Sequence, residues 1–214
     1  MADKSIEKNT ITYSAVISSC EKCWDWHQAL QLLHEMGECF VERSTITYNS
    51  TISACQKCGK WQQALHLVYD MAEKSVERHT ITYNAAISAC DKGETYQQAL
   101  HLLREMDECR FERDTITYNA AIRSCDWCGA WQQALYLMYD TTERSVARKV
   151  LTYRAAISAC LTGAQWQPSL DLLRDMWIGR VEMDAFTCKS ALAACRLGSQ
   201  WWRAAQLFRE MADR

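Results

Sequence analysis

The chain has 214 residues, of which 49% are hydrophobic and 23% are charged, so it has enough apolar material for a core and is not disordered as a whole. One proline and seven glycines are too few for the turns of a β-rich fold or for a low-complexity linker, which excludes collagen-like and all-β architectures. The net charge of −2 lacks the basic character of typical polyanion-binding domains, although residues 144–214 carry +5 and residues 1–143 carry −7.

The first nine residues, MADKSIEKN, match a later segment of the same chain, MAEKSVERH at 71–79. We therefore expect residues 1–9 to be the tail of a preceding repeat, and we identify neither a signal peptide nor a transit peptide in this polar segment. Solenoids normally carry polar capping elements, and neither end of the sequence has one. The expectation is a piece of a longer array, or a chain whose ends are covered by partners.

An internal repeat of 35 residues organises the rest of the chain. A period of this length is typical of solenoids and propellers. Aligned on a recurring tyrosine, the chain divides into full repeats at 10–44, 45–79, 80–114, 115–149 and 150–184, and a truncated repeat at 185–214. The aligned residues are Tyr13, Tyr48, Tyr83, Tyr118 and Tyr153.

The second repeat shows the helical pattern best. Tyr48, Ile52 and Cys55 are spaced as one face of a helix, which Thr45 or Thr47 caps at its start and Gly59 ends as the C′ residue. A second helix has its apolar stripe at Trp61, Ala64, Leu65, Val68 and Met71.

Each repeat is therefore predicted to form two helices joined by a short turn. One such hairpin cannot bury its own apolar face, but stacked hairpins share a continuous core. The predicted fold is all-α, a single right-handed α-solenoid over residues 1–214 with the first helices lining the concave side.

The motif Ile-Thr-Tyr-Asn-x₂-Ile-Ser-Ala-Cys-x-Lys-x-Gly-x-Trp-x₂-Ala-Leu-x-Leu-x₃-Met closely resembles the pentatricopeptide repeat, in its 35-residue P-type form. The resemblance covers practically the whole chain. Tetratricopeptide and ankyrin repeats have other signatures, which are absent. The resemblance implies a protein of the chloroplast or the mitochondrion, with its targeting segment outside this sequence.

No catalytic arrangement is visible. None of the five histidines lies in the His-x-Glu signature of zinc deaminases, and there is no Gly-rich phosphate loop and no Gly-x-Ser-x-Gly elbow. We expect no enzyme activity and no cofactor. No apolar run approaches the length of a membrane span, so we expect no membrane insertion.

The cysteines are predicted to serve packing, because six of them recur every 35 residues in the same slot. The Cys-x-x-Cys pairs suggest zinc, but pairs in successive repeats are separated by 31 residues and would lie about 8–10 Å apart. A zinc ion needs its sulfurs at about 2.3 Å. We favour packing over a zinc site or a disulfide framework.

The resemblance to the family implies binding of single-stranded RNA, at about one base per repeat. In the family, the fifth and last residues of a repeat together choose the base. Carried over by position, the pairs are Ser14/Ser44, Asn49/His79, Asn84/Asp114, Asn119/Lys149 and Arg154/Asp184, with Lys189 alone in the sixth repeat.

Two further sets follow from the same resemblance. The second residue of each repeat wedges between bases, and a lysine at the thirteenth position touches phosphate; three of the six repeats lack that lysine. The wedging residues are Ile11, Ile46, Ile81, Ile116, Leu151 and Phe186, and the phosphate lysines are Lys22, Lys57 and Lys92. The implied target is 5′-purine-pyrimidine-U-pyrimidine-3′, while Arg154 and Lys189 depart from the family pattern.

These residues also permit plainer interpretations. The Asn and Ser side chains are alternatively solvated polar groups near a helix start. The recurring tryptophans at 26, 61, 131, 166 and 201 are interpreted as core residues, and Arg43, Arg78, Arg113 and Arg148 as solvent-facing loop residues or a phosphate-facing row. The first hypothesis is a sequence-selective organellar RNA-binding protein acting in RNA stabilisation, processing or translation. The rival is a protein–protein scaffold, a subunit or assembly factor of an organellar ribosome or of a photosynthetic or respiratory assembly.

Overall fold

The computed structural model describes residues 9–93, 95–199 and 201–212, and this part of the chain contains twelve α-helices and no strand. Each predicted repeat contains two of them, so the all-α architecture is confirmed. Only Asn9 of the predicted tail 1–9 lies within the described residues. The helices are α1 (Thr10–Cys23), α2 (Trp26–Glu38), α3 (Thr45–Lys57), α4 (Trp61–Glu73), α5 (Thr80–Lys92), α6 (Tyr96–Glu108), α7 (Thr115–Trp127), α8 (Trp131–Glu143), α9 (Val150–Thr162), α10 (Trp166–Ile178), α11 (Ala185–Leu197) and α12 (Trp201–Ala212).

Local chemistry sets the ends of the first helix in each repeat. The side chain of Asn9 accepts a hydrogen bond from the Thr12 N–H, and Ser44 does the same for Thr47, so both are N-caps. Helix α3 ends at Lys57, and Gly59 follows with φ +66°, which confirms it as the C′ residue. Trp24 holds the equivalent left-handed conformation in the first repeat, where a side chain makes it more costly.

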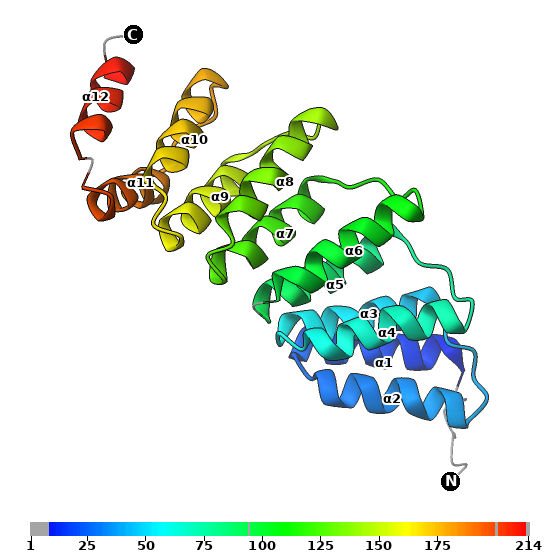
Figure 1. Cartoon of the computed structure of the whole chain (residues 1–214). Coiled ribbons are helices and arrows are strands. Elements are labelled where there is room, and N and C mark those ends of the chain that lie inside the picture. The colour runs from blue at the N-terminus through cyan, green and yellow to red at the C-terminus, as the bar shows by residue number, and fades with distance from the viewer. Residues whose placement is uncertain (1–8, 94, 200, 213–214) are drawn as a thin grey trace. The chain divides into compact units, whose positions relative to one another are not determined.

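The described helices fall into two compact units. The N-terminal unit comprises residues 1–93 and 104–112, and the C-terminal unit comprises residues 94–103 and 113–214, so α6 contributes to both. In the N-terminal unit, α1, α3 and α5 pack in succession, α2 lies against α1 and α3, and α4 lies against α3 and α5 (Figure 1). Each second helix therefore contacts the first helix of its own repeat and of the next.

The C-terminal unit has the same arrangement. Helices α7, α9 and α11 pack in succession, α8 lies against α7 and α9, and α10 lies against α9 and α11 (Figure 1). Helix α12 contacts α10 and α11. Within each unit the repeats share one core, as expected for stacked hairpins. None of the described helices combines the length and the apolar character needed to cross a membrane.

The repeated cysteine slot belongs to this core. Five of the six cysteines in it are buried, namely Cys55, Cys90, Cys125, Cys160 and Cys195. Burial raises the pKa of three of these thiols to about 12 (Cys55, Cys125 and Cys160), so they stay protonated and unreactive at neutral pH. All twelve cysteines are free, and the described residues contain no group of three side chains able to hold a metal ion.

The recurring tryptophans pack on the backbone of the next repeat. A Cβ placed on Gly93 would lie 2.0 Å from Cδ1 of Trp61, and a Cβ on Gly163 would lie 2.5 Å from Cδ1 of Trp131. Glycine is therefore required for this close approach. Trp26, Trp61, Trp131 and Trp166 are half-buried, so these rings lie at the edge of the core and not inside it. The interpretation as core residues is wrong for Trp201, which is 72% exposed on the last described helix.

Candidate nucleic-acid interface

The six predicted wedging residues are all exposed on the first helices. Their exposed fractions run from 42% at Phe186 to 80% at Ile11. Exposed apolar side chains at one repeated position, beside a buried core, are available for a ligand such as a stacked base. The structure places them where the predicted role requires, and the role itself stays a prediction.

The fifth residue of the second repeat is fixed by the third repeat. Oδ1 of Asn49 accepts a hydrogen bond of 2.8 Å from the Thr82 hydroxyl, and Oγ1 of Thr82 accepts one of 3.2 Å from the backbone N–H of His79. A hydroxyl carries a single proton, and here it goes to the amide oxygen. The amide of Asn49 therefore has its oxygen held at Thr82 and its NH₂ directed away, as a donor.

The C-terminal unit repeats this network. Oδ1 of Asn119 accepts a hydrogen bond of 2.6 Å from the Thr152 hydroxyl, whose oxygen accepts one of 3.3 Å from the backbone N–H of Lys149. The last residue of one repeat and the fifth residue of the same repeat are thus joined through a threonine of the next repeat. In the predicted base-reading pairs Asn49/His79 and Asn119/Lys149, the asparagine side chain is thus linked to the backbone N–H of its partner.

The other fifth residues have different surroundings. Ser14 donates to the Thr10 carbonyl of its own helix at 2.5 Å, so its proton is used internally. Asn84 is only 9% exposed; it belongs to the N-terminal unit, whereas its predicted partner Asp114 belongs to the C-terminal unit. Lys189 is exposed on α11.

Three of the last residues act as helix N-caps. Ser44 caps α3, Asp114 caps α7, and Asp184 caps α11. Hydrogen bonds from the hydroxyl and the backbone N–H of Thr187 hold the pKa of Asp184 below its usual range, so this carboxylate is ionised and only accepts. His79 and Lys149 occupy the equivalent positions before α5 and α9.

Two of the three predicted phosphate lysines bond within the N-terminal unit. Nζ of Lys57 lies 3.1 Å from the Glu21 carbonyl oxygen and 3.2 Å from Glu21 Oε1, and Nζ of Lys92 donates to the Lys57 carbonyl at 2.8 Å. Each links the ends of adjacent first helices. Lys22 is exposed. The lysine positions therefore serve helix packing as well as any contact with phosphate.

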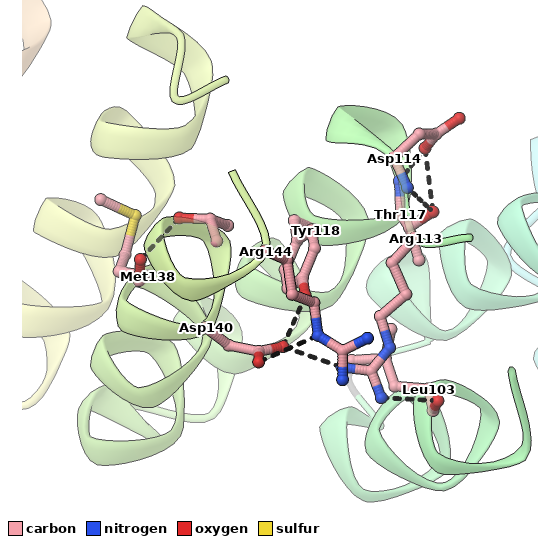
Figure 2. Close-up of polar contacts among 9 residues, drawn as sticks. Leu103, Arg113, Asp114, Thr117, Tyr118, Met138, Asp140 and Arg144 are labelled. Carbon is pink, nitrogen blue, oxygen red and sulfur yellow. Dashed lines mark hydrogen bonds and ion pairs between the residues drawn. The ribbon is translucent and has the colours of Figure 1, made fainter. Parts of the chain in front are cut away.

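The four recurring arginines are half-buried, namely Arg43, Arg78, Arg113 and Arg148. Nη1 of Arg113 lies 2.8 Å from Asp140 Oδ2, and its other amino group donates to the Leu103 carbonyl. Tyr118 and Arg144 also bind Asp140, and Figure 2 shows the three side chains converging on this carboxylate. We call the combination of tyrosine, acidic residue and arginine the clasp.

The clasp recurs in the N-terminal unit. Arg43 pairs with Asp70 at 3.6 Å, and Tyr48 donates to the same carboxylate at 2.6 Å. Arg78 and Tyr83 both bind Glu105. The interpretation of the row as solvent-facing or phosphate-facing is therefore wrong for Arg43, Arg78 and Arg113, since each binds the second helix of the following repeat. The regular spacing of acidic residues at 35, 70, 105, 140 and 175 was the signal that would have predicted it.

The clasp perturbs its ionisable groups. Burial alone would raise the pKa of Asp140, but hydrogen bonds from Tyr118 and Arg144 outweigh it and hold this pKa below its usual range. Burial and the hydrogen bond to Asp140 raise the pKa of Tyr118 to about 12. Both shifts follow from an ionised carboxylate that accepts from a neutral phenol.

A pocket of about 370 Å³ lies on the first helices of the C-terminal unit. It contains four predicted site residues, Asn119, Leu151, Arg154 and Phe186. It also contains side chains that the sequence comparison did not select. These are Arg123, Asp126, Trp127 and Ser158. Arg123 stands where the three preceding repeats have serine, which was the available signal.

Comparison with known protein families identifies the repeat. Models described as the pentatricopeptide repeat domain, the PPR repeat family and the PPR repeat match residues 1–57, 43–92 and 81–111, respectively. A comparison with curated proteins finds no significant match.

The fold also matches solved structures. The pentatricopeptide repeat protein PPR10 from maize is 21% identical with a TM-score of 0.73, over 98% of this chain and 30% of PPR10. PPR10 in complex with an 18-nt psaJ RNA element is 19% identical with a TM-score of 0.70, over 96% of this chain and 34% of that one. The chain thus spans well under half the length of PPR10.

The PPR domain of Arabidopsis thaliana protein-only RNase P 1, in complex with tRNA, is 13% identical with a TM-score of 0.73, over 91% of this chain and 98% of that domain. At such identities the likeness establishes the fold, and the repeat models and the 35-residue motif establish the family. The chain is a pentatricopeptide repeat protein.

Proposed function

We propose that this chain binds single-stranded RNA sequence-selectively in a chloroplast or mitochondrion, where it acts in RNA stabilisation, processing or translation. The observation that supports this most is the combination of exposed apolar wedging residues with oriented asparagine amides on the first helices of both units. An apolar side chain separates neighbouring bases, and a fixed NH₂ group donates to a base edge. PPR10 was solved with a psaJ RNA element and the related PPR domain with tRNA, which agrees with this proposal.

The proposed order of bases is 5′-purine-pyrimidine-U-pyrimidine-3′ over the first four repeats. Asn49 and Asn119 donate to the acceptors of a pyrimidine, since the oxygen of each amide is held by threonine. Arg154 and Lys189 do not fit the family pattern, so the fifth and sixth repeats are outside this order.

The test is binding of the full chain to a labelled RNA that contains this order, measured by fluorescence anisotropy over a range of salt. Binding should weaken steeply as salt rises. Asn49→Ala should weaken binding about 5-fold through one lost base contact, and Asn84→Thr should change the preferred base at one position. Gln62→Ala removes an exposed amide from α4 and should have no effect. Failure of the chain to retain any single-stranded RNA at low salt would refute the proposal.

A scaffold in a large organellar assembly is the second candidate. The observation that favours it lies on α8, where Tyr136 and Tyr139 are each 67% exposed three residues apart on a second helix. Aromatic side chains in such a position are typical of protein interfaces. A scaffold role predicts that the chain migrates with a large assembly in organelle extracts and that the double variant Tyr136→Ser, Tyr139→Ser is released from it. Under either proposal the chain acts by binding, without catalysis and without a cofactor.

A further inference from the structure

The pocket on α7, α9 and α11 has an unusual combination of side chains for this protein. Its lining includes two arginines, Arg123 and Arg154, and one acidic residue, Asp126. The Asp126 carboxylate accepts a hydrogen bond of 3.1 Å from the Thr162 hydroxyl, which holds it at the neighbouring first helix. The lining therefore carries a net positive charge, which favours an anion.

Contacts with Phe186 and Asp184 hold Arg154 in position, and they use few of the N–H donors of its guanidinium group. Its guanidinium carbon lies 4.0 Å from the centre of the Phe186 ring, and Nη1 lies 3.9 Å from Asp184 Oδ2. Stacking leaves the edge of the guanidinium group directed outward, and a contact of 3.9 Å with a carboxylate is weak. Because the side chain is 43% exposed, its N–H donors are accessible to a phosphate or a base.

Trp127 supplies an aromatic face. It ends α7 at the position where the first three repeats have Lys22, Lys57 and Lys92, and its side chain is 63% exposed. An exposed indole offers a large flat surface on which a ligand can stack. Aromatic faces bind bases of any identity by stacking.

The size of the pocket agrees with one nucleotide. Its volume of about 370 Å³ lies near the lower end of the range of about 300–1,000 Å³ for small-molecule sites. The two exposed apolar residues Leu151 and Phe186 flank Arg154 along the first helices, and they belong to the set of predicted wedging residues.

We propose that this pocket binds one nucleotide of single-stranded RNA, with its base stacked on Trp127 and its phosphate bound by Arg123 and Arg154. The inference rests on the proposed RNA-binding function. It adds Arg123 and Trp127, which lie outside the predicted base-reading pairs, and assigns Arg154 to phosphate. In the C-terminal unit, which lacks the lysines predicted to contact phosphate, Arg123 and Arg154 then supply the cations. A docked protein segment is the competing occupant.

The experiment measures binding of the full chain to a fluorescein-labelled single-stranded RNA of random sequence. Trp127→Ala should weaken binding about 5- to 100-fold, and Trp127→Phe should restore most of it, because a base stacks on either ring. Arg123→Gln should reduce the slope of log K against log salt by about 0.7, the value for one phosphate on a single strand.

Matched controls separate the pocket from general effects. Tyr69→Ala removes an exposed aromatic residue from α4, and Arg174→Gln removes an exposed charge from α10; both should bind as the parent does. A further control moves one abasic nucleotide along an RNA of defined sequence that contains the proposed order of bases. At one placement it should weaken binding to the parent and weaken binding to Trp127→Ala no further.

Two results would overturn the inference in different ways. If Asn49→Ala weakens binding while Trp127→Ala and Arg123→Gln behave as the controls do, the RNA-binding function stands and the pocket has another role. Phosphate contacts are strong at low salt, such as about 50 mM. If the parent chain binds no RNA under that condition, both proposals fail, and a protein segment is the remaining candidate occupant of the pocket.

Discussion

The thirteenth position of the repeat has different chemistry in the two units but makes the same connection. In the N-terminal unit, Lys57 binds Glu21, the twelfth residue of the preceding repeat. In the C-terminal unit, Oγ1 of Thr162 lies 3.1 Å from Oδ1 of Asp126, which is also the twelfth residue of the preceding repeat. It lies 3.0 Å from the Ser158 carbonyl of its own helix as well, so its single proton is shared between the two acceptors. In the fifth repeat, a link between adjacent first helices is therefore retained without the cation.

The difference shows that a repeated cation is not by itself evidence of a phosphate site. In the N-terminal unit the lysines contact carbonyl and carboxylate oxygens of the protein, whereas in the C-terminal unit the exposed pocket contains Arg123 and Arg154. The charge available to a ligand in each unit therefore has to be counted from its exposed donors. The following predictions compare how the two units are stabilised.

The largest expected effect comes from the clasp of the C-terminal unit. Arg113 and Asp140 have side chains that are 7% and 10% exposed, whereas Arg43 and Asp70 are 17% and 18% exposed and lie farther apart. Removing one partner of a buried pair leaves an uncompensated charge. We expect Arg113→Met to lower the free energy of unfolding by about 3 kcal/mol and Arg43→Met by about 1 kcal/mol, measured by urea denaturation. Equal losses would show that burial does not distinguish the two clasps.

The same pair predicts a dependence on pH. The pKa of Asp140 is lower in the folded chain than in the unfolded one, so its contribution to stability is complete above the unfolded value of about 3.9 and is lost as pH falls through the folded value. The urea midpoint should therefore decrease below about pH 4. Asp140→Asn should be less stable at neutral pH and should show a smaller further decrease on acidification.

The next effect concerns the contact between tryptophan and glycine. Gly93→Ala places a Cβ against the Trp61 ring, and the displacement should cost about 2 kcal/mol, again by urea denaturation. The matched control is Cys58→Ala, because Cys58 occupies the same position of the preceding repeat and already carries a Cβ. A neutral result for Gly93→Ala would mean that the indole moves freely and does not hold the repeats together.

The smallest expected effect on stability distinguishes lysine from threonine at the thirteenth position of the repeat. Lys57→Met and Thr162→Val should each lower the free energy of unfolding by about 0.5–1 kcal/mol, because each removes one partly exposed link. The loss from Lys57→Met should shrink at high salt, while the loss from Thr162→Val should be independent of salt. The same salt response in both would contradict the assignment of one link to an ion pair and the other to a neutral donor.

The periodic part of the molecule was predictable from the sequence. The tyrosines, isoleucines and cysteines recur every 35 residues, and this spacing fixes the helices and the buried slots. The polar contacts between adjacent repeats were harder to predict, because they join residues that are 27–36 positions apart. Asn49 with Thr82 is one example and Arg113 with Asp140 is another.

The sequence predicted which positions form the candidate site, but it did not predict how their side chains are oriented or exposed. The family resemblance selected Asn119 and Arg154, but the orientation of Asn119 depends on Thr152 of the following repeat. The orientation of Arg154 depends on Asp184 of its own repeat and on Phe186 of the next. Trp127 departs from the lysine pattern, and a departure alone does not say whether the new side chain is buried or exposed. Its exposure became apparent only when the end of α7 was placed in three dimensions.

The hydrogen bond from Thr82 to Asn49 has a consequence for modularity. A repeat that is exchanged as a block from its first to its last residue carries its own asparagine but leaves behind the threonine that orients it. The transferable unit of recognition therefore extends into the third residue of the next repeat. In the fifth repeat, where Arg154 replaces asparagine, the corresponding Thr187 hydroxyl donates to Asp184 instead. Grafting an asparagine at position 154 would thus require the neighbouring threonine to exchange partners before the new amide acquired a defined direction.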